Sequence, residues 1–390
     1  MKKIEYIIKT NKFVQSIYVF FGTIFFRFIG LFVRIDKNLI IFNSFSGKLF
    51  NDSPRVLYEE IISNEKYKNY RCVWAFCDLK AFKDKVNCKI VKQDSFKYFV
   101  TAMKAKYWIT NVNIQRGLKI KRKGNICLDT WHGTGPKTIG NSVKGRKDYN
   151  FSNINYILAD GPFLRDAFIN SFNARSENVH VIGRPREDIL FDYKDKVKEA
   201  RAIYVDKFNL PKDKIIILFA PTWRESGNGG KSYDIGFSFD LEKWAKILGD
   251  KYLILFRAHS ITNNYKIPNL SNVIDVTSVE NINELYLASD ILISDYSSCY
   301  TDFSILSKPM LCYAPDYDEY CATRGLVYDL NPLFTSGVIK DEDVLLNAIK
   351  NIDFEKECDN SRKFNYHFVT CDGNATEKSL ALLFSDGGSK

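Results

Sequence analysis

The chain has 390 residues, of which 45% are hydrophobic and 15% aromatic, enough apolar material for two packed domains of ordinary size. This composition excludes an intrinsically disordered or fibrous protein, and 21 Gly and 10 Pro residues leave little room for low-complexity sequence. The 56 Lys and Arg residues exceed the 46 Asp and Glu residues by a net charge of +10, which suits nucleic acid, an anionic membrane or a phosphorylated substrate equally.

Cysteine and histidine usage argues against disulfides and structural zinc. The nine cysteines are an odd number without a CxxC pair, and several stand inside apolar runs such as 125–128 and 310–313. We therefore expect buried free thiols, which are typical of a reducing cytoplasm. The four histidines form no HExxH motif and no paired Cys/His spacing, so no metal site is predicted.

The first 36 residues form a segment of their own. Four lysines precede an apolar, aromatic stretch at 13–26, which Arg27 and Arg34 then interrupt. A transmembrane helix needs about 20 apolar residues, so this stretch is too short to span, and no small-residue cleavage site follows it. We expect residues 1–36 to be an amphipathic helix in a membrane interface, with packing of its Phe side chains on the protein's own core as the alternative.

From residue 38 onward, short apolar runs alternate with helical segments, which is the pattern of parallel α/β structure. Buried strands are predicted over 39–44, 71–77, 107–111, 125–130, 156–160 and 179–183. Helices are predicted between them over 54–63, 95–104, 162–172 and 186–191, several with Pro or a capping residue at the start.

A second αβ series follows a charged helix at 194–209. Its predicted strands are 214–220, 252–257, 273–276, 291–294 and 310–313, and its predicted helices are 241–248, 282–289, 298–306 and 342–349. The order predicts two Rossmann-like domains, 37–209 and 210–390, facing each other across a cleft. Ligands of such sheets bind beyond the carboxyl ends of the strands, so the loops after strands are the candidate sites.

A histidine follows the strand that ends at Thr130. His132 stands on a turn with Gly133 and Gly135, and the glycines permit close approach of a substrate backbone or phosphate. Imidazole titrates near neutrality, so His132 is a candidate general base. A turn histidine bonded to a carbonyl is the alternative.

Basic residues follow three further strands. Arg184 and Arg186 stand beside Gly183, where they either hold phosphate or belong to an ordinary helix start with acidic residues. Arg257 and His259 end a strand and offer a guanidinium fork and an imidazole to phosphate oxygens, with a structural ion pair as the alternative. A third strand leads into 220–225 and then a Gly-rich, polar loop at 226–232, which we expect to be mobile over the cleft.

A polar segment at 295–302 joins a strand to a helix. The unsatisfied amides of that helix start, together with the hydroxyls of Ser297 and Ser298, predict an anion site that suits a diphosphate. A plain helix cap is the alternative. The chain contains no Walker A loop and no GxGxxG fingerprint, so an ATPase or a dehydrogenase is poorly supported.

These segments together resemble the CDP-glycerol glycerophosphotransferase family, the teichoic acid primases and polymerases. The resemblance covers about residues 38–385, and SFSGKLFNDSP at 44–54 and DGNATEKSL at 372–380 add to it. Its main motifs are WHGTGPKTIG (131–140), GRPRED (183–188), APTWRE (220–225), FRAHS (256–260), ISDYSSCYTDF (293–303) and RGLVYDL (324–330). It implies a GT-B fold of two Rossmann-like domains, with a carboxyl-terminal helix returning to the first.

The resemblance also implies an activity: transfer of a polyol phosphate from a CDP-activated donor to a hydroxyl of a membrane-bound acceptor, with release of CMP. His132 and His259 are then the catalytic residues. The donor diphosphate is assigned to Thr222, Arg224, Arg257, Asp295, Ser297, Ser298 and Asp302. Acceptor contacts are assigned to Gly133, Lys137, Arg184 and Arg186, and Arg224 is an alternative member of this group.

Two departures from the family pattern matter. After the WHG triplet the family has a Thr-Pro-Leu-Lys-like order, whereas Gly135 and Pro136 precede Lys137 here. The long amino-terminal extension of many polymerases is also missing, which favours a primase-like or short capsule-type transferase. Glycerol phosphate is the first choice of transferred group and ribitol phosphate the second, and the acceptor is a lipid-linked saccharide or polyol phosphate.

No cofactor is expected, metal dependence stays open, and the enzyme is placed in the cytoplasm, peripheral on the inner face of the membrane. A GT-B sugar transferase with another nucleotide donor is a rival interpretation. A basic protein that binds membranes or nucleic acid is a second rival. No nucleic acid partner is expected, because the unusual residues gather at strand ends instead of forming a basic stripe with interleaved aromatics.

Overall fold

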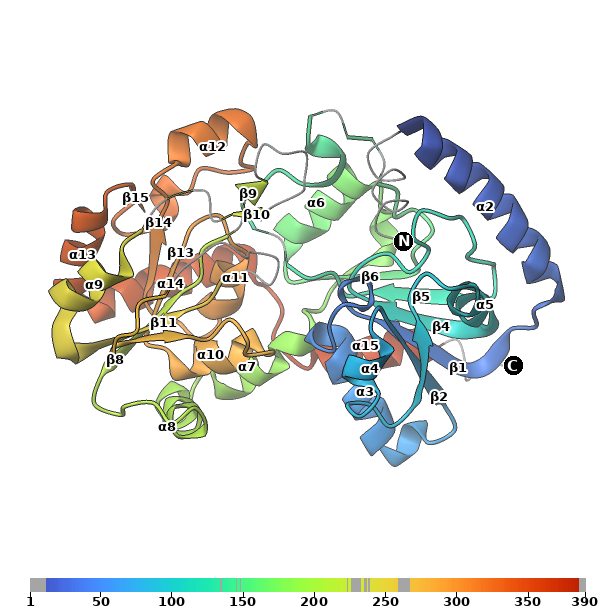
Figure 1. The fold of residues 1–390 in the computed structure, drawn as a ribbon, viewed down its shortest axis with the longest axis horizontal. Helices are drawn as coiled ribbons and strands as arrows, with labels where there is room; N and C mark the ends of the chain where they lie inside the picture. The colour runs from blue at the N-terminus through green and yellow to red at the C-terminus, as the bar shows by residue number, and fades with distance from the viewer. Residues whose placement is uncertain are drawn as a thin grey trace.

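The protein, seen here as a computed structural model, is described over residues 12–385 except 134, 145, 148, 223, 226–232, 235–236, 238 and 259–266. It consists of two lobes, each built on a parallel β-sheet covered by helices (Figure 1). The predicted α/β class with two Rossmann-like sheets is therefore confirmed. Strands buried on both faces read in sequence as continuous apolar runs, which is why most of them were predictable.

The first lobe holds a seven-stranded sheet of order β3-β2-β1-β4-β5-β6-β7. Its strands are β1 (Asp36–Asn43), β2 (Arg71–Phe76), β3 (Lys89–Lys92), β4 (Ala105–Thr110), β5 (Ile126–Asp129), β6 (Tyr156–Ala159) and β7 (Val179–Val181). Its helices are α2 (Lys12–Phe32), α3 (Asp52–Ser63), α4 (Leu79–Phe82), α5 (Phe96–Lys104) and α6 (Pro162–Phe172). Apolar clusters fill both faces of this sheet.

The second lobe holds a six-stranded sheet of order β12-β11-β8-β13-β14-β15. Its strands are β8 (Ile215–Phe219), β11 (Tyr252–Phe256), β12 (Val273–Asp275), β13 (Ile291–Ser294), β14 (Met310–Tyr313) and β15 (Val338–Ile339). Its helices are α7 (Asp188–Tyr193), α8 (Val197–Lys207), α9 (Leu241–Leu248), α10 (Ile282–Ala288), α11 (Cys299–Ser304), α12 (Tyr317–Thr323) and α13 (Glu342–Lys350). A two-stranded ribbon pairs β9 (Arg224–Glu225) with β10 (Tyr233–Asp234).

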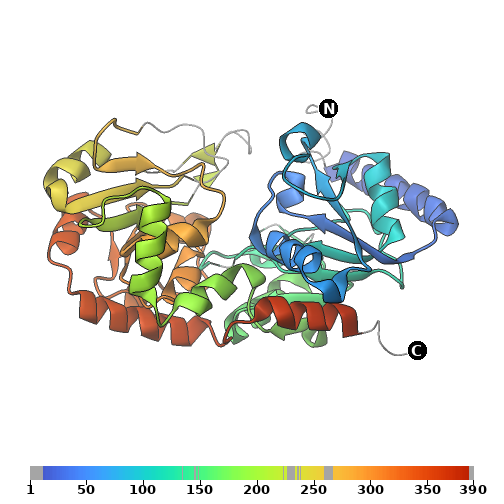
Figure 2. The same cartoon turned by 90° about the horizontal axis from the view of Figure 1, so that it is seen from below.

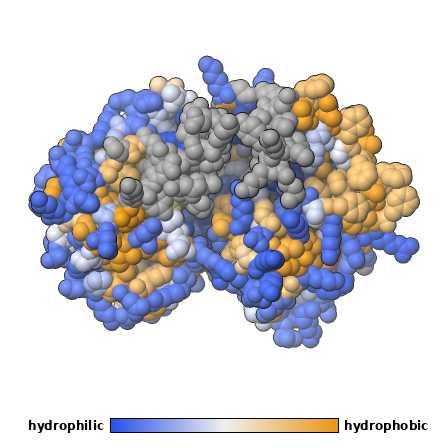
Figure 3. All heavy atoms as spheres, in the orientation of Figure 1, coloured by the Kyte–Doolittle hydropathy of each residue, from blue (hydrophilic) through white to orange (hydrophobic). Residues whose placement is uncertain are grey.

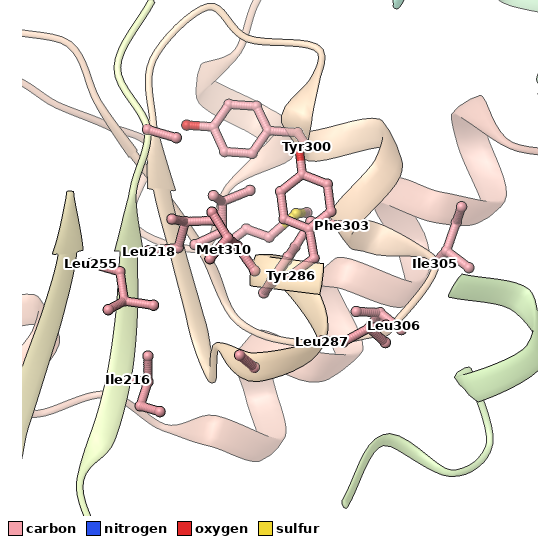
Figure 4. Close-up of a cluster of buried hydrophobic side chains, with 14 of the residues drawn as sticks. Ile216, Leu218, Leu255, Tyr286, Leu287, Tyr300, Phe303, Ile305, Leu306 and Met310 are labelled. Carbon is pink, nitrogen blue, oxygen red and sulfur yellow. The ribbon is translucent and has the colours of Figure 1, made fainter. Parts of the chain in front are cut away.

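The core of the second lobe includes helices that the sequence assigned elsewhere. Figure 4 shows part of this core, where Tyr286, Tyr300 and Phe303 pack beside Met310. Buried side chains of α7 and α8 belong to the same cluster, because their apolar faces cover this sheet. The packing thus groups α8 with the second sheet, although the sequence placed 194–209 in the first domain.

Two carboxyl-terminal helices run along the underside of both lobes, as the red ribbons of Figure 2 show. They are α14 (Phe354–Phe368) and α15 (Ala375–Phe384). Phe364 and Phe368 pack in the core of the second lobe, whereas Leu380 and Leu383 pack in that of the first. The chain therefore crosses between the lobes once more near its end.

Helix α2 lies at the outer edge of the first lobe and presents three faces (Figure 1). Tyr18, Phe26 and Ile29 pack on the core of the lobe. Another face exposes large apolar side chains, which form the orange surface at the upper right of Figure 3: Phe13, Ile17, Phe20, Phe21, Ile24, Phe25, Phe28, Leu31 and Phe32. A third face lines the cleft described below.

The apolar stretch predicted at 13–26 was shorter than the helix that the structure shows. The helix continues through Arg27, and its 20-residue stretch Phe13–Phe32 is long and apolar enough to cross a membrane by length and composition alone. The sequence argument stopped at Phe26 because it treated Arg27 as an interruption. In the structure the Arg27 Nε donates a hydrogen bond to the Lys119 carbonyl at 3.0 Å, so the charged group is tied to the protein.

Candidate functional site

A cleft with a volume of about 2080 Å³ runs between the two lobes. It lies where the loops after the parallel strands of both sheets meet, as expected for this architecture. Nine predicted site residues line it: His132, Gly133, Lys137, Arg186, Thr222, Arg257, Ser297, Ser298 and Asp302. The predicted catalytic His259 lies outside the described residues.

His132 is held in one ring orientation by the neighbouring loop. Its Nδ1 lies 2.7 Å from the Asn111 carbonyl oxygen. Since a carbonyl only accepts hydrogen bonds, Nδ1 carries the proton and Nε2 keeps the lone pair. The rings of Trp131 and Phe45 flank the imidazole with centroids 4.4 and 5.4 Å away. A carbonyl-bonded turn histidine and a general base were posed as alternatives; the carbonyl bond is present, and it leaves the Nε2 lone pair able to accept a proton.

The surroundings keep the imidazole neutral. Burial lowers the pKa of His132 from its ordinary value of 6.5, while the Asn111 carbonyl and the nearby Asp52 carboxylate raise it and the arginines lower it. The net direction is downward. A neutral imidazole at physiological pH is the form that accepts a proton.

Glycines let the His132 loop lie directly against the second lobe. A Cβ added to Gly133, whose φ is +118°, would stand 2.4 Å from the Ser298 Oγ. A Cβ on Gly135 would stand 2.9 Å from the Tyr296 carbonyl oxygen and 3.0 Å from the Ser298 amide nitrogen. The sequence predicted that these glycines admit substrate; in the structure they admit the Asp295–Ser298 turn.

Arg186 connects the two lobes next to the histidine. Its Nη1 donates to Asp52 at 2.8 Å and to the His132 carbonyl at 3.3 Å. Its Nη2 donates to the Asp302 carboxylate of the second lobe at 2.8 Å. Burial alone would raise the pKa of Asp52, but Arg186 and the Ser53 amide hold it below its ordinary range. Arg186 thus ties Asp302 to the backbone of the candidate base.

Arg184 does not line the cleft, unlike the acceptor-binding role predicted for it. Its side chain is fully buried, and its Nη2 lies 2.6 Å from Asp160, 2.5 Å from Glu187 and 3.0 Å from Asp302. Burial raises the pKa of Glu187 well above its ordinary range. In this conformation the guanidinium is enclosed by carboxylates, because burying a charge requires partners. Asp302, which lines the cleft, is likewise engaged by arginines.

Asp295 and Arg224 stand behind Thr222 and do not line the cleft either. The fully buried Asp295 carboxylate accepts from the Thr222 amide at 2.9 Å and from its hydroxyl at 3.0 Å. Arg224 donates to Asp295 at 2.9 Å, binds Asp316 through Nε and Nη2, and lies 4.7 Å from the Tyr296 ring centroid. These two predicted donor contacts therefore frame Thr222, which does face the cleft.

Positive charge gathers where the cleft meets the second lobe. Arg257 is fixed by hydrogen bonds from Nη1 to the Val276 and Val279 carbonyls. Lys137 pairs with Leu326 of the second lobe in an isolated β-bridge, and burial lowers its pKa to about 8. The sequence assigned Lys137 to the acceptor, but its neighbours Asp295 and Arg324 belong to the second lobe.

Several residues of the site were not predicted. Asn111 acts through its backbone carbonyl, which no side-chain pattern reveals. Asp52 and Arg324 stood inside motifs quoted for the family resemblance, so their motif membership was the available signal. Among the described residues, no group of three His, Cys, Asp or Glu side chains is placed to hold a metal ion.

Comparison with known proteins places this geometry in a family. Residues 24–385 match the family described as CDP-Glycerol:Poly(glycerophosphate) glycerophosphotransferase. The chain is 31% identical over 337 residues to a teichoic acid glycerol-phosphate transferase of Staphylococcus aureus, covering 82% of this chain and 85% of that protein. It is 28% identical over 384 residues to a teichoic acid poly(ribitol-phosphate) polymerase of Bacillus spizizenii, covering 95% of this chain and 60% of the relative.

A solved structure shares the fold over nearly the whole chain. The wall teichoic acid polymerase TagF, as a variant soaked with CDPG, superposes with a TM-score of 0.79 at 27% identity. The match covers 97% of this chain and 98% of the solved one. The predicted GT-B arrangement and the predicted family are both confirmed. The chain belongs to the CDP-glycerol:poly(glycerophosphate) glycerophosphotransferase family.

Proposed function

We propose that the enzyme transfers glycerol phosphate from CDP-glycerol to a hydroxyl of a membrane-linked acceptor and releases CMP. Its family membership makes it a polyol-phosphate transferase of teichoic acid synthesis that uses a CDP-polyol donor. The observation that carries the finer proposal is His132, whose Nδ1 is bound to a carbonyl so that Nε2 is the ring nitrogen able to accept a proton.

In the proposed step, the acceptor hydroxyl attacks the phosphorus atom that bears the polyol. A new acceptor O–P bond forms, the P–O bond to the CMP phosphate breaks, and the bonding electrons leave with CMP. His132 Nε2 takes the hydroxyl proton, because the hydroxyl alone is a weak nucleophile. The neutral state favoured by burial suits this role.

The cations at the junction of the cleft with the second lobe would hold the diphosphate and stabilise the charge on departing CMP. Arg257 and Lys137 line the cleft together with the Thr222, Ser297 and Ser298 side chains. Guanidinium, ammonium and hydroxyl donors are the groups that stabilise phosphate oxygens in transfer reactions. His259 keeps its predicted role on the donor.

Ribitol phosphate is the alternative transferred group, since a relative at 28% identity is named for ribitol. The two polyols are separated by incubating the purified protein with CDP-glycerol or CDP-ribitol and the same acceptor, with EDTA in a parallel reaction. CMP from CDP-glycerol alone supports the proposal. CMP from CDP-ribitol alone would mean that the transferred group is ribitol phosphate. Absence of CMP with both donors would contradict the proposed reaction and leave only the fold and the family established.

We propose further that α2 holds the enzyme on the inner face of the cell membrane. Its exposed Phe and Leu side chains form a contiguous apolar surface (Figure 3), which is typical of interfacial helices. Replacing Phe21, Phe25 and Phe28 by Glu should abolish co-flotation with anionic vesicles. Tyr366→Glu changes a side chain that is 87% exposed elsewhere and should float normally. Equal flotation of both variants would contradict the anchor.

A further inference from the structure

The carboxylates that line the cleft are already paired with cations. Within the described part of the chain, each of the six forms an ion pair, and the pairs are Asp52–Arg186, Glu59–Arg55, Asp94–Arg116, Glu280–Arg55, Glu284–Lys207 and Asp302–Arg186. Five further cleft cations form no ion pair with a carboxylate of the described residues: Arg27, Lys119, Lys121, Arg257 and Arg324. Their charge is available to an anionic ligand.

These five cations and Lys137 form two separate groups, and Arg146 lines the cleft as well. Lys137, Arg257 and Arg324 lie at the second lobe, where the donor diphosphate is proposed. The other group stands at the α2 end of the same cleft, at the outer edge of the first lobe (Figure 1). It consists of Arg27, Lys119 and Lys121, and no carboxylate of the described residues pairs with any of them.

The second group, here called the α2 cation group, is built on fixed backbone. Arg27 Nε donates to the Lys119 carbonyl at 3.0 Å, and the Lys119 amide donates to the buried Thr23 hydroxyl at 3.2 Å. The Lys121 amide donates to the Gln115 side chain at 3.0 Å. Burial lowers the pKa of Lys121, because it disfavours the charged form.

Helix α2 links this group to the rest of the cleft. Gln15, Val19, Thr23 and Arg27 line the cleft at steps of four residues, which places them on one face of the helix. The exposed apolar face of the same helix lies beside this one, and two of its residues, Phe20 and Ile24, also line the cleft. Arg27 of the α2 cation group therefore stands on the helix that also carries the exposed apolar surface.

We propose that Arg27, Lys119 and Lys121 form a second anion site that binds a phosphate group of the acceptor while its terminal hydroxyl lies at His132. The inference rests on the proposed transfer reaction and adds to it a site that binds the acceptor through its phosphate. The bound phosphate could come from either of two molecules, an acceptor chain or a lipid headgroup. The test separates them.

The test compares Arg27→Gln/Lys119→Gln/Lys121→Gln with the charge-preserving Lys119→Arg/Lys121→Arg and with Lys66→Gln/Lys68→Gln, which removes two charges away from the cleft. The readouts are the Kd of a soluble oligo(glycerol phosphate), its KM as acceptor, and the KM of the CDP-polyol. An uncharged analogue with the same terminal glycerol is measured in parallel. Thermal unfolding checks that each variant is folded.

The site predicts that the triple variant raises the Kd and KM of the oligo(glycerol phosphate) by about 10- to 100-fold. The KM values of the donor and of the uncharged analogue should stay within about twofold, and the two control variants should match the wild type. The difference should shrink at high salt, because exposed charges are screened.

Two results would overturn the site. One is an unchanged Kd and KM for the oligo(glycerol phosphate). The other is an unchanged Kd combined with weaker binding to vesicles of equal parts phosphatidylglycerol and phosphatidylcholine, which would assign the cations to lipid headgroups. Failure of the proposed function would be seen separately, as absence of CMP with the wild type. In that case the Kd of the oligo(glycerol phosphate) for the wild type and for the triple variant still tests the site.

Discussion

At the scale of single residues, the candidate base is defined by groups that the chain supplies from far away. The Asn111 carbonyl fixes the tautomer of His132, and Asp52 and Arg186 act on its charge in opposite directions. Arg186 also contacts the His132 backbone and the Asp302 carboxylate. The protonation and the position of the base are thus set by one group of contacts.

This arrangement predicts the pH dependence of turnover. A base works in its neutral form, so kcat/KM should fall as the pH drops through the pKa of His132, which burial places below 6.5. Asp52 raises that pKa, so Asp52→Asn should move the acidic limb to still lower pH. A pH profile of CMP release measures the shift. Movement of the limb to higher pH would contradict the role given to Asp52.

The buried ion pairs around Arg184 predict a large effect on stability. Arg184→Met removes the cation that contacts the buried acidic side chains of Asp160 and Glu187, while Asp302 keeps Arg186, and loss of one partner of a buried pair costs about 3–5 kcal/mol. Urea unfolding should show this decrease. Glu65→Gln, which breaks an exposed pair with Lys68, should cost only about 0–1 kcal/mol. Equal effects would mean that the buried network is not stabilising.

At the scale of elements, the loop that holds Gly135 joins the candidate base to the second lobe. Gly135 packs on the Tyr296 carbonyl and the Ser298 amide. The Val327 amide donates to the Pro136 carbonyl at 2.7 Å, and the Thr138 amide donates to the Gly325 carbonyl at 3.1 Å. The Gly-Pro order that departs from the family pattern falls within this contact.

Gly135→Ala should therefore act on catalysis more than on stability. Its Cβ would meet backbone atoms at 2.9–3.0 Å, so the loop must move away from the Asp295–Ser298 turn. We expect the KM of the CDP-polyol to rise by about tenfold or more, since about 1.4 kcal/mol of lost contact corresponds to that factor. Gly249→Ala is the control for backbone strain, because its φ is +67° while its Cβ would meet no atom within 4 Å; it should lower stability and leave the KM of the CDP-polyol unchanged. An unchanged KM in Gly135→Ala would mean that the contact between this loop and the Asp295–Ser298 turn does not contribute to donor binding.

The sequence predicted strands and helices best where the pattern of apolar residues alone identified them. Strands such as β13 and β14 were predicted with their observed bounds because their runs are uniformly apolar. The short edge strands β3 and β15 were missed, since they present few buried residues. Helix α14 was missed because most of its residues are polar. Among its aromatic residues, only Phe364 and Phe368 are buried.

The site was predictable in its positions and less so in its contacts. Residues after strand ends were expected at the cleft, and His132, Thr222 and Ser298 line it. The burial of Arg184 depends on Asp302, which is 118 positions away in the chain. No local pattern carries such a pairing, so an arginine that binds phosphate and one enclosed by carboxylates look alike in sequence.

At the scale of the whole molecule, the cleft joins three kinds of surface. The second lobe contributes Arg257 and the hydroxyls proposed for the donor, the first lobe contributes His132 and Lys137, and α2 lies beside the cleft with an apolar outer face. Helices α14 and α15 tie the lobes together from below (Figure 2). An acceptor held at a membrane surface and a donor from solution can meet in such a cleft.

The central claim is that this cleft transfers a polyol phosphate with His132 as the base. The direct measurement is acceptor-dependent CMP release from the CDP-polyol by the wild type, His132→Ala and His367→Ala. Loss of the base should lower kcat by about 10²- to 10⁴-fold with donor affinity little changed. His367 lies in the last turn of α14, outside the cleft lining, so its variant should retain wild-type turnover. Near-normal CMP release by His132→Ala would contradict the account.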